Sequence, residues 1–183
     1  EFGDEGWSVT PIPARVASEI VVAHHYLHRR PPIAAAFGLE VDGGLMGAVT
    51  YGVPASRHLQ KSACPSEPDL VIELNRLWVH DELPRNTESW LVSRTLKALP
   101  PRIVVSYADL AQGHVGYVYR ALNFRYAGWT DMDRKTPRFD YIPTDPSRHS
   151  RDAFRAGFVD KRRRLPKVRY WTTTGDRATR RAL

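Results

Sequence analysis

The sequence predicts a mixed α/β fold with an antiparallel start and a βαβ centre. Three observations lead to this class. A hairpin signal comes early in the chain, strand and helix patterns alternate after it, and 183 residues correspond to about one domain. The hydrophobic content of 42% and the aromatic content of 10% are typical of a chain that buries a core.

The first half of the chain supplies a helix, the hairpin and a long connection. Residues 13–28 are expected to form a helix, because a proline stands at its first turn and apolar residues recur at helical spacing. Two apolar runs, 34–41 and 45–53, flank an Asp-Gly-Gly turn that is typical of a hairpin. The proline-rich stretch 54–69 is expected to be irregular.

The second half contains the strand–helix–strand unit. A strand is expected over 70–79, and a helix capped at Asn86 or Thr87 follows it. A short buried strand, 103–107, comes next. The remaining elements are a helix over 113–122, strands over 125–130 and 139–142 and a short helix over 152–159, with nothing assigned from Lys161 onward. We expect one mixed sheet with helices on both faces.

Basic residues are concentrated at the end of the chain. The 27 lysines and arginines, 22 of them arginine, exceed the 20 acidic residues, and the net charge is +7. Residues 1–133 have a balance of −3, whereas residues 134–183 have a balance of +10. We therefore expect a main domain over 4–133 and a basic extension over 134–183 that packs on it and contacts nucleic acid. A solvated tail is the alternative.

Arginines and aromatic residues are interleaved in this basic extension, as phosphate contact combined with base stacking requires. A solvated turn is the alternative explanation for the arginine run. The candidate nucleic-acid-binding residues are Lys161, Arg162, Arg163, Arg164, Lys167 and Arg169, with Tyr170 and Trp171 beside them.

Several classes of protein are excluded. Cys64 is the only cysteine, which excludes an internal disulfide and multi-cysteine metal centres. No run of about 18 apolar residues is present, and the acidic, polar first residues are unlike a secretory signal. A cytoplasmic protein with no membrane partner is therefore expected. The sequence also has no P-loop, no dinucleotide-binding glycine motif and no Gly-x-Ser-x-Gly elbow.

Three histidines, His24, His25 and His28, stand together at the end of the first expected helix. The spacing between His24 and His28 suits two metal ligands on one helical face, but a third ligand must come from elsewhere, and Asp109 is a candidate. The alternatives are a surface or base role and histidines that merely end a fraying helix.

Asp109 comes directly after the buried strand 103–107, where open α/β sheets bind ligands. Tyr119, ten residues further on, is placed to face the same crevice. General base and general acid or hydrogen-bond donor are the roles open to this pair, and a helix-capping role is the alternative for Asp109. Tyr51, at the end of the second hairpin strand, signals nothing by itself.

The polar loop 84–89 lies between a strand and a helix, so the first free N–H groups of that helix suit a phosphate or pyrophosphate. The candidate cofactor-binding residues there are Arg85, Asn86 and Ser89.

Five segments follow one another in a distinctive order. After the hairpin come Glu73-Leu74-Asn75-Arg76-Leu77, Pro84-Arg85-Asn86-Thr87-Glu88-Ser89-Trp90, Ser106-Tyr107-Ala108-Asp109 and Gly116-x-x-Tyr119-x-x-x-Asn123-Phe124. In this order they resemble the phage Mom proteins, which modify DNA and are related to acyltransferases of the GNAT fold. The resemblance covers roughly residues 14–130.

The resemblance implies a transferase that adds an acetamido (carbamoylmethyl)-type group to N6 of adenine in double-stranded phage DNA. This modification blocks host restriction enzymes, and the enzyme acts in the cytoplasm of the host cell. The resemblance implies a GNAT-like catalytic domain over 4–133, and its catalytic residues map onto His25, Tyr51, Asp109 and Tyr119, with His24 and His28 as rivals of His25.

The resemblance also raises the question of cofactors. An iron ion is associated with the family, for which His25 and Asp109 are the candidate ligands. GNAT enzymes hold the coenzyme A pyrophosphate with a glycine-containing loop, but the loop 84–89 has no glycine here. The small-molecule donor, acetyl-CoA or a related acyl compound, therefore stays open, as does the oligomeric state, for which a dimer is one option.

Three functions remain to be compared. The first is the DNA-modifying transferase, with Asp109 receiving an N6 proton and Tyr119 and Tyr51 shaping the pocket. The second is an acyl-CoA-dependent N-acyltransferase acting on a small amine or a protein. The third is a DNA-binding protein without activity. Tight acetyl-CoA binding without DNA favours the second, and cellular effects that survive Asp109→Ala favour the third.

Overall fold

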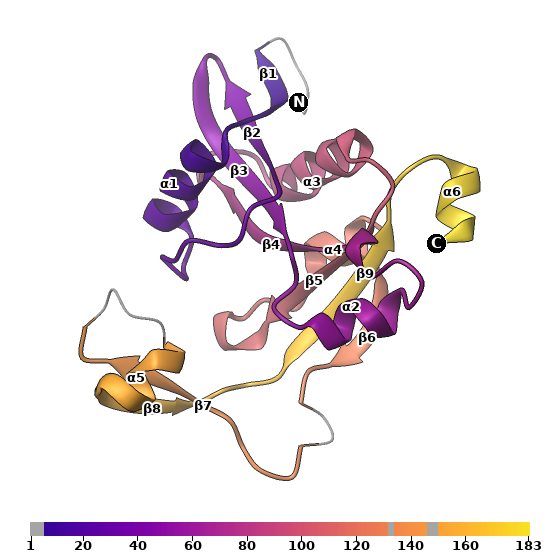
Figure 1. Ribbon diagram of the computed structural model, residues 1–183. Coiled ribbons are helices and arrows are strands. Elements are labelled where there is room, and N and C mark those ends of the chain that lie inside the picture. Colours follow the sequence, from indigo (N-terminus) through magenta and orange to yellow (C-terminus); the bar gives the residue numbers. More distant parts are fainter. Residues whose placement is uncertain (1–5, 132–133, 146–149) are drawn as a thin grey trace.

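The computed structural model of the protein describes residues 6–131, 134–145 and 150–183. It contains one large mixed sheet and a small second sheet (Figure 1). In spatial order, the large sheet consists of β1 (Trp7–Pro11), β2 (Ala35–Val41), β3 (Gly44–Gly52), β4 (Val71–Val79), β5 (Ile103–Asp109), β9 (Lys167–Thr173) and β6 (Arg125–Trp129). Its paired strands are antiparallel except for β4 and β5, which are parallel.

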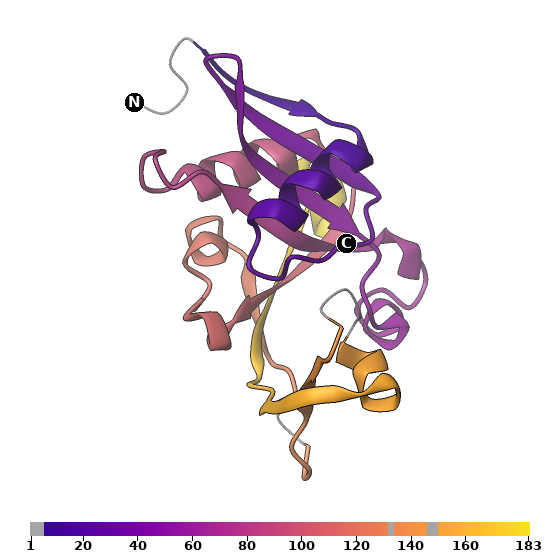
Figure 2. The same ribbon diagram turned by 90° about the vertical axis from the view of Figure 1, so that its left-hand side faces the viewer.

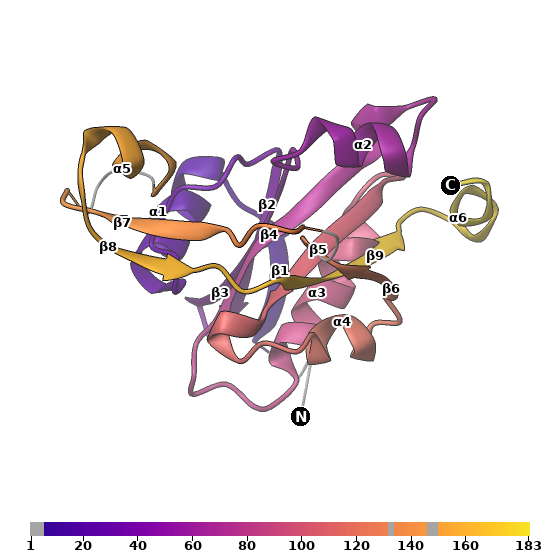
Figure 3. The same cartoon turned by 90° about the horizontal axis from the view of Figure 1, so that it is seen from below.

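Helices cover both faces of the large sheet, as predicted. Helices α1 (Ala14–His24) and α2 (Arg57–Ala63) cover one face. Helices α3 (Thr87–Ala98) and α4 (Tyr117–Ala121) cover the other face (Figures 1 to 3). Neighbouring residues of β5 point to opposite faces: Val104 packs in the cluster that contains Leu91 of α3, whereas Val105 packs in the cluster that contains Leu59 of α2. This alternation is the two-residue period of a strand.

The predicted hairpin and βαβ unit are both present. The hairpin is β2 and β3, joined at Asp42 and Gly43, which both have positive φ values. The βαβ unit is β4, α3 and β5, with β5 returning parallel to β4. The Pro13 start of α1 is also confirmed, although the helix ends at His24, before the predicted end.

The main difference from the sequence expectation lies in the basic segment. Residues 167–173 form β9, which inserts between β5 and β6 and so completes the large sheet. Its apolar residues alternate with basic ones: Val168 and Tyr170 are buried, whereas Lys167 and Arg169 point to the other face. Because the basic residues mask this alternation, the sequence showed no strand here.

Other elements were also missed or shifted. Strand β1 and helix α2 were not predicted, and α2 begins with Ser56, whose side chain accepts the Leu59 N–H. The predicted domain limits at 4–5 and 132–133 lie outside the described residues. Short 3₁₀ helices cover Pro68–Leu70 and Leu110–Gln112, and α6 covers Arg177–Ala182.

A separate unit projects from the large sheet. It consists of β7 (Phe139–Pro143), α5 (Ser150–Ala156) and β8 (Phe158–Arg163), and we call it the arm. Strands β7 and β8 pair antiparallel with each other, and α5 packs on β7. Figures 1 and 2 show the arm beyond the edge of the helix-covered sheet. In the described part of the chain, no helix is long and apolar enough to cross a membrane.

Candidate functional site: a cleft between two parallel strands

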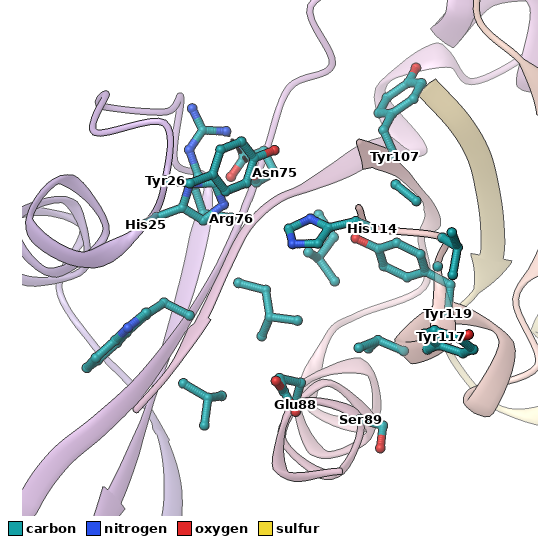
Figure 4. A pocket seen from close by; sticks show the side chains of 18 of the residues that line it. His25, Tyr26, Asn75, Arg76, Glu88, Ser89, Tyr107, His114, Tyr117 and Tyr119 are labelled. Carbon is teal, nitrogen blue, oxygen red and sulfur yellow. Dashed lines mark hydrogen bonds between the residues drawn. The ribbon is translucent and has the colours of Figure 1, made fainter. Parts of the chain in front are cut away.

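Strands β4 and β5 separate part-way along their length. They pair only from Val71 with Ile103 to Glu73 with Val105, after which each strand stays with its other neighbour. An extra residue, Asn75, bulges from β4 at this point, because Thr50 pairs with Arg76 whereas Tyr51 pairs with Leu74. Bulges bend a strand and redirect its side chains. The separation opens a cleft of about 880 Å³ (Figure 4).

One wall of the cleft is built by the end of α1 and by β4. His25, Tyr26, Asn75 and Arg76 lie together there (Figure 4). The His25 ring stacks on Tyr26 with 4.3 Å between centroids, and its Nδ1 accepts the Leu27 N–H. Burial, with the neighbouring positive charge of Arg76, lowers the pKa of His25 to about 4. His25 is therefore a neutral imidazole at neutral pH.

Arg76 brings a positive charge into this wall. Its Nε is buried and has no hydrogen-bond partner among the described residues, and its Nη1 donates to the Asn75 carbonyl over 2.6 Å. Burial lowers the pKa of Arg76, although the guanidinium stays charged at neutral pH. A buried donor without a partner is costly. Arg76 is therefore suited to a ligand that offers an acceptor.

The opposite wall is built by α4 and the loop before it, including His114 and Tyr119 (Figure 4). The Ser106 hydroxyl lies 2.8 Å from the Tyr119 hydroxyl and 2.9 Å from the Leu74 carbonyl oxygen, which fixes the phenol in place. Burial raises the pKa of Tyr119, so it remains protonated. The structure thus places Tyr119 on the crevice, as the sequence suggested.

Gly116 determines how closely α4 approaches the sheet. It precedes α4 with a φ of +82°, and an added Cβ would lie 2.4 Å from the Tyr170 ring. The Tyr170 hydroxyl in turn donates to the Val115 carbonyl. Only glycine fits this conformation and this contact. The Tyr119 position therefore depends on Gly116.

Asp109 is held by three neighbours. Its Oδ2 lies 2.7 Å from Lys167 Nζ and accepts a long hydrogen bond of 3.5 Å from the Tyr26 hydroxyl. Its Oδ1 accepts the Ala111 N–H, so Asp109 also caps the short helix that follows. The Asp109 side chain is 11% exposed. Lys167 and Tyr26 line the cleft, whereas Asp109 does not.

Glu73 is the carboxylate that lines the cleft at the point where the strands part. Burial raises its pKa, and the Ala55 backbone and the positive charges of Arg76 and Lys167 only partly oppose this effect. A carboxyl group with a raised pKa is better suited to accept a proton at neutral pH than an ordinary one.

Tyr51 lies elsewhere. Its side chain is fully buried between β3 and α3, and its hydroxyl bonds the Thr95 hydroxyl over 2.6 Å. Thr95 itself bonds the Val92 carbonyl, so the phenol belongs to a closed network in the core. Tyr51 is not among the residues that line the cleft.

The start of α3 forms the floor of the cleft. Arg85 and Asn86 line the cleft there, together with Glu88 and Ser89 (Figure 4). Asn86 occupies the position before the helix with a φ of +72°, but its side chain does not cap the helix. The helix N-terminus and the Arg85 guanidinium suit an anionic group, whereas the Glu88 carboxylate opposes one.

The histidines do not form a metal site with Asp109. His24 stacks on Trp78 with 4.4 Å between centroids, and the His28 Nδ1 bonds the Val22 carbonyl. His25 and Asp109 are the two candidate ligands. The Nδ1 of His25 accepts the Leu27 N–H, and both carboxylate oxygens of Asp109 already have partners. Within the described ranges no three His, Cys, Asp or Glu side chains are grouped to hold a metal. These residues do not fit an iron ion.

The candidate DNA-binding residues fall into two places. Lys161, Arg162 and Arg163 are exposed on β8 of the arm, and Arg164 follows them. Lys167 and Arg169 lie in the large sheet, where Lys167 pairs with Asp109 and the Arg169 guanidinium lies 6.0 Å from the Tyr107 ring centroid. The structure therefore separates residues that are close in sequence.

Sequence reasoning did not single out Tyr26, Glu73 and Arg76 as site residues. Glu73 and Arg76 stand in an otherwise apolar strand, and this is a signal, because charged residues in a buried strand need a reason. Their convergence with Asp109 depends on the bulge at Asn75 and on the parting of β4 from β5, which a sequence pattern does not reveal.

Solved structures share this fold. The model superposes on an N-acetyltransferase from Staphylococcus aureus Mu50 with a TM-score of 0.54 and 14% identity, covering 91% of this chain and 98% of that one. A GNAT-family acetyltransferase from Bacillus cereus gives a TM-score of 0.51 and 14% identity over 93% of this chain and 99% of that chain. A protein from Salmonella typhimurium, solved with its cofactor acetyl-CoA, gives a TM-score of 0.55 and 11% identity, covering 98% of this chain and 100% of that one. The fold is that of the GNAT acetyltransferases.

The sequence comparison places the chain in one family within this fold. The model of the Mom protein family matches residues 6–181, so the chain belongs to that family. The methylcarbamoylase Mom of Escherichia phage Mu is 33% identical over 135 residues, which are 69% of this chain and 56% of the phage Mu protein. The chain thus matches little more than half the length of that relative.

Proposed function

We propose that the protein is a DNA-modifying transferase that adds an acetamido (carbamoylmethyl)-type group to N6 of adenine and so protects phage DNA from host restriction. The observation that carries the proposal is the cleft of about 880 Å³ between β4 and β5 in a chain of the Mom family. A cleft of this volume accommodates one nucleobase and a small donor. The target adenine must leave the base stack to enter it.

The residues of the cleft support a division of roles. In the transfer, a bond forms from adenine N6 to the donor carbon, the bond to the leaving group breaks, and N6 loses a proton. Two carboxylates are available for that proton: Glu73 lines the cleft, and Asp109 connects to it through the Tyr26 hydroxyl. Tyr119, held by Ser106 and kept protonated by burial, is placed to donate a proton to the leaving group.

The donor is proposed to bind at the start of α3, through Arg85, Asn86 and Ser89. When bound, an acyl-CoA-type donor supplies a carbonyl carbon and gives an N6-acyl adduct with the CoA thiol as leaving group, whereas a carbamoylmethyl adduct needs a donor whose methylene carbon bears the leaving group. Arg85 and the first N–H groups of α3 suit the phosphates of an acyl-CoA, but Asn86 stands where glycine allows a closer backbone approach, and Glu88 adds a negative charge. We therefore expect weaker binding of free acetyl-CoA than a dedicated acetyltransferase shows.

Mass spectrometry of nucleosides tests the function directly. Plasmid DNA from phage-free cells that express the protein is digested and compared with DNA from cells that express Asp109→Ala. We expect a new deoxyadenosine adduct that disappears in the variant, and its mass identifies the transferred group. Unmodified DNA from cells with soluble, folded protein, together with tight acetyl-CoA binding in calorimetry without DNA, contradicts the proposal and favours an acyltransferase of small amines or proteins.

A further inference from the structure

The two strands of the arm carry different chemistry on their two faces. In an antiparallel pair, residues directly opposite each other share a face. Phe139 lies opposite Arg163 and Tyr141 lies opposite Lys161, and we call this the basic face. The opposite side, called the acidic face, carries Asp140 opposite Arg162 and Ile142 opposite Asp160.

The acidic face neutralises its own charges. Arg162 Nε lies 3.7 Å from Asp160 Oδ2, and the Arg164 guanidinium, just beyond β8, donates to Asp140. Each aspartate on this face thus has a basic partner within the arm. This face offers little net charge to a polyanion.

The basic face has no such compensation. Among the described residues, no carboxylate is paired with the side chains of Lys161 and Arg163, and both residues are exposed. Lys161 Nζ lies 5.2 Å from the Phe139 ring centroid. Tyr141 packs against Phe154 of α5, so α5 covers the β7 side of this face and the β8 side, with Lys161 and Arg163, stays open; Phe154 itself is 64% exposed. Two free cations beside half-buried aromatic rings and the exposed Phe154 complement a phosphate backbone.

The arm is also close to the cleft along the chain. Arg163, at the end of β8, and Lys167, which lines the cleft, are four positions apart in the sequence. Fully extended, this stretch spans at most about 14 Å, which is comparable to the major groove width of about 12 Å. The proposed target atom, adenine N6, is displayed on the major-groove edge of its base pair, and that groove admits a two-stranded β-ribbon.

We propose that the open β8 side of the basic face lies in the major groove of duplex DNA beside the target adenine, with Lys161 and Arg163 on the phosphates. The inference rests on the proposed function for the choice of duplex DNA as the occupant. It assigns DNA contact to alternate residues of β8, rather than to the arginine run as a whole. Lys167 and Arg169 have no part in it, because they belong to the large sheet.

Single alanine variants of three successive residues give a matched test. Lys161→Ala, Arg162→Ala and Arg163→Ala each remove one positive charge from the same exposed strand. Binding to a fluorescent DNA duplex is measured by anisotropy at several salt concentrations. We expect Lys161→Ala and Arg163→Ala each to lower the slope of log K against log salt by about 0.9, and the double variant to weaken binding at least tenfold. Arg162→Ala leaves both quantities within error of the wild type.

Two further probes identify the groove and the nucleic acid. A minor-groove ligand such as distamycin leaves binding unchanged, and an RNA duplex of the same sequence binds more weakly, because its major groove is too narrow for side chains. Equal effects of the three alanine variants, or competition by distamycin, overturn the inference. If these three variants differ as expected but the wild type forms no deoxyadenosine adduct, the arm binds DNA and the proposed function fails. If adducts form while the three variants bind alike, the proposed function survives and the arm inference fails.

Discussion

The cleft and the arm use charged residues in opposite ways. In the cleft, Asp109 and Lys167 are paired over 2.7 Å within a set of hydrogen bonds that fixes their positions. On the arm, Lys161 and Arg163 stand on an exposed face without acidic partners among the described residues. Lys161 and Lys167 are close in sequence, yet one is free to bind a partner and the other orients a buried carboxylate. Local position on a strand, not membership of a basic run, decides the role.

Lys167→Met tests this comparison with the largest expected effect. The variant keeps the aliphatic part of the side chain but leaves Asp109 without its cation, so we expect adduct formation to fall about 100-fold or more. The free energy of unfolding should fall by about 1–3 kcal/mol, between the values for exposed and buried pairs, because Lys167 is 33% exposed.

The salt dependence of duplex binding is the matched measurement. Lys167→Met should leave the slope of log K against log salt unchanged, whereas Lys161→Ala should lower it. A reduced slope for Lys167→Met, with adduct formation intact, would show that Lys167 belongs to the DNA-binding surface after all.

A second comparison uses two tyrosines, Tyr119 in α4 and Tyr51, which packs against α3. Tyr119→Phe removes a hydroxyl from the cleft, and we expect at least a tenfold loss of adduct formation with little loss of stability. Tyr51→Phe removes a hydroxyl from the closed network with Thr95. That change should cost about 1 kcal/mol of stability and leave activity near the wild-type level. Denaturant unfolding and nucleoside mass spectrometry separate the two; loss of activity in Tyr51→Phe without loss of stability would return Tyr51 to the catalytic set.

The pKa of His25 makes stability depend on pH. Its folded pKa of about 4 is below the ordinary value of 6.5, so the unfolded chain binds the proton more readily between these values. Stability should therefore rise from pH 4 to pH 6.5 and level off above, with a contribution on the order of 3 kcal/mol. His25→Gln flattens this part of the curve, whereas His58→Gln, at an exposed position, leaves it unchanged. Denaturant midpoints across the pH range measure both; identical curves for the two variants would contradict the assignment.

Glu73 gives the smallest expected effect, and its sign is opposite. Burial raises the pKa of Glu73, so the folded state holds the proton to higher pH than the unfolded chain, and stability falls as pH rises through the folded pKa. Glu73→Gln should therefore raise the thermal midpoint at pH 7 by a few degrees while lowering adduct formation. Glu67→Gln, on the exposed loop before β4, is the control and should change neither. A lower midpoint for Glu73→Gln would mean that the carboxylate has partners that stabilise it.

The parts of the fold that local signals define were predicted from the sequence. The hairpin follows from its Asp-Gly-Gly turn, and the βαβ unit follows from two apolar runs around a helix, although the predicted cap at Asn86 does not form. Strand β9 was not predicted, because Lys167 and Arg169 hide the apolar alternation of Val168 and Tyr170. Asp109 and Tyr119 were singled out as candidates because a strand end and a helix face are local features. Arg76 and Glu73 were not, because their place in the cleft depends on strands that part from each other.

The extra residue in β4 has a consequence for how the strand tolerates change. Before Asn75, even-numbered residues such as Ile72 and Leu74 pack in the core cluster beneath α3; after it, odd-numbered residues such as Leu77 do so. The bulge thus changes the core-facing positions of one strand from even-numbered to odd-numbered residues. Without Asn75, Leu77 would follow Leu74 at the ordinary spacing of two and Arg76 would keep its face, whereas a regular strand that kept Asn75 would present Arg76 to the apolar layer. A one-residue deletion at Asn75 is therefore milder than a deletion elsewhere in β4, since it straightens the strand and leaves the inside and the outside of everything that follows unchanged.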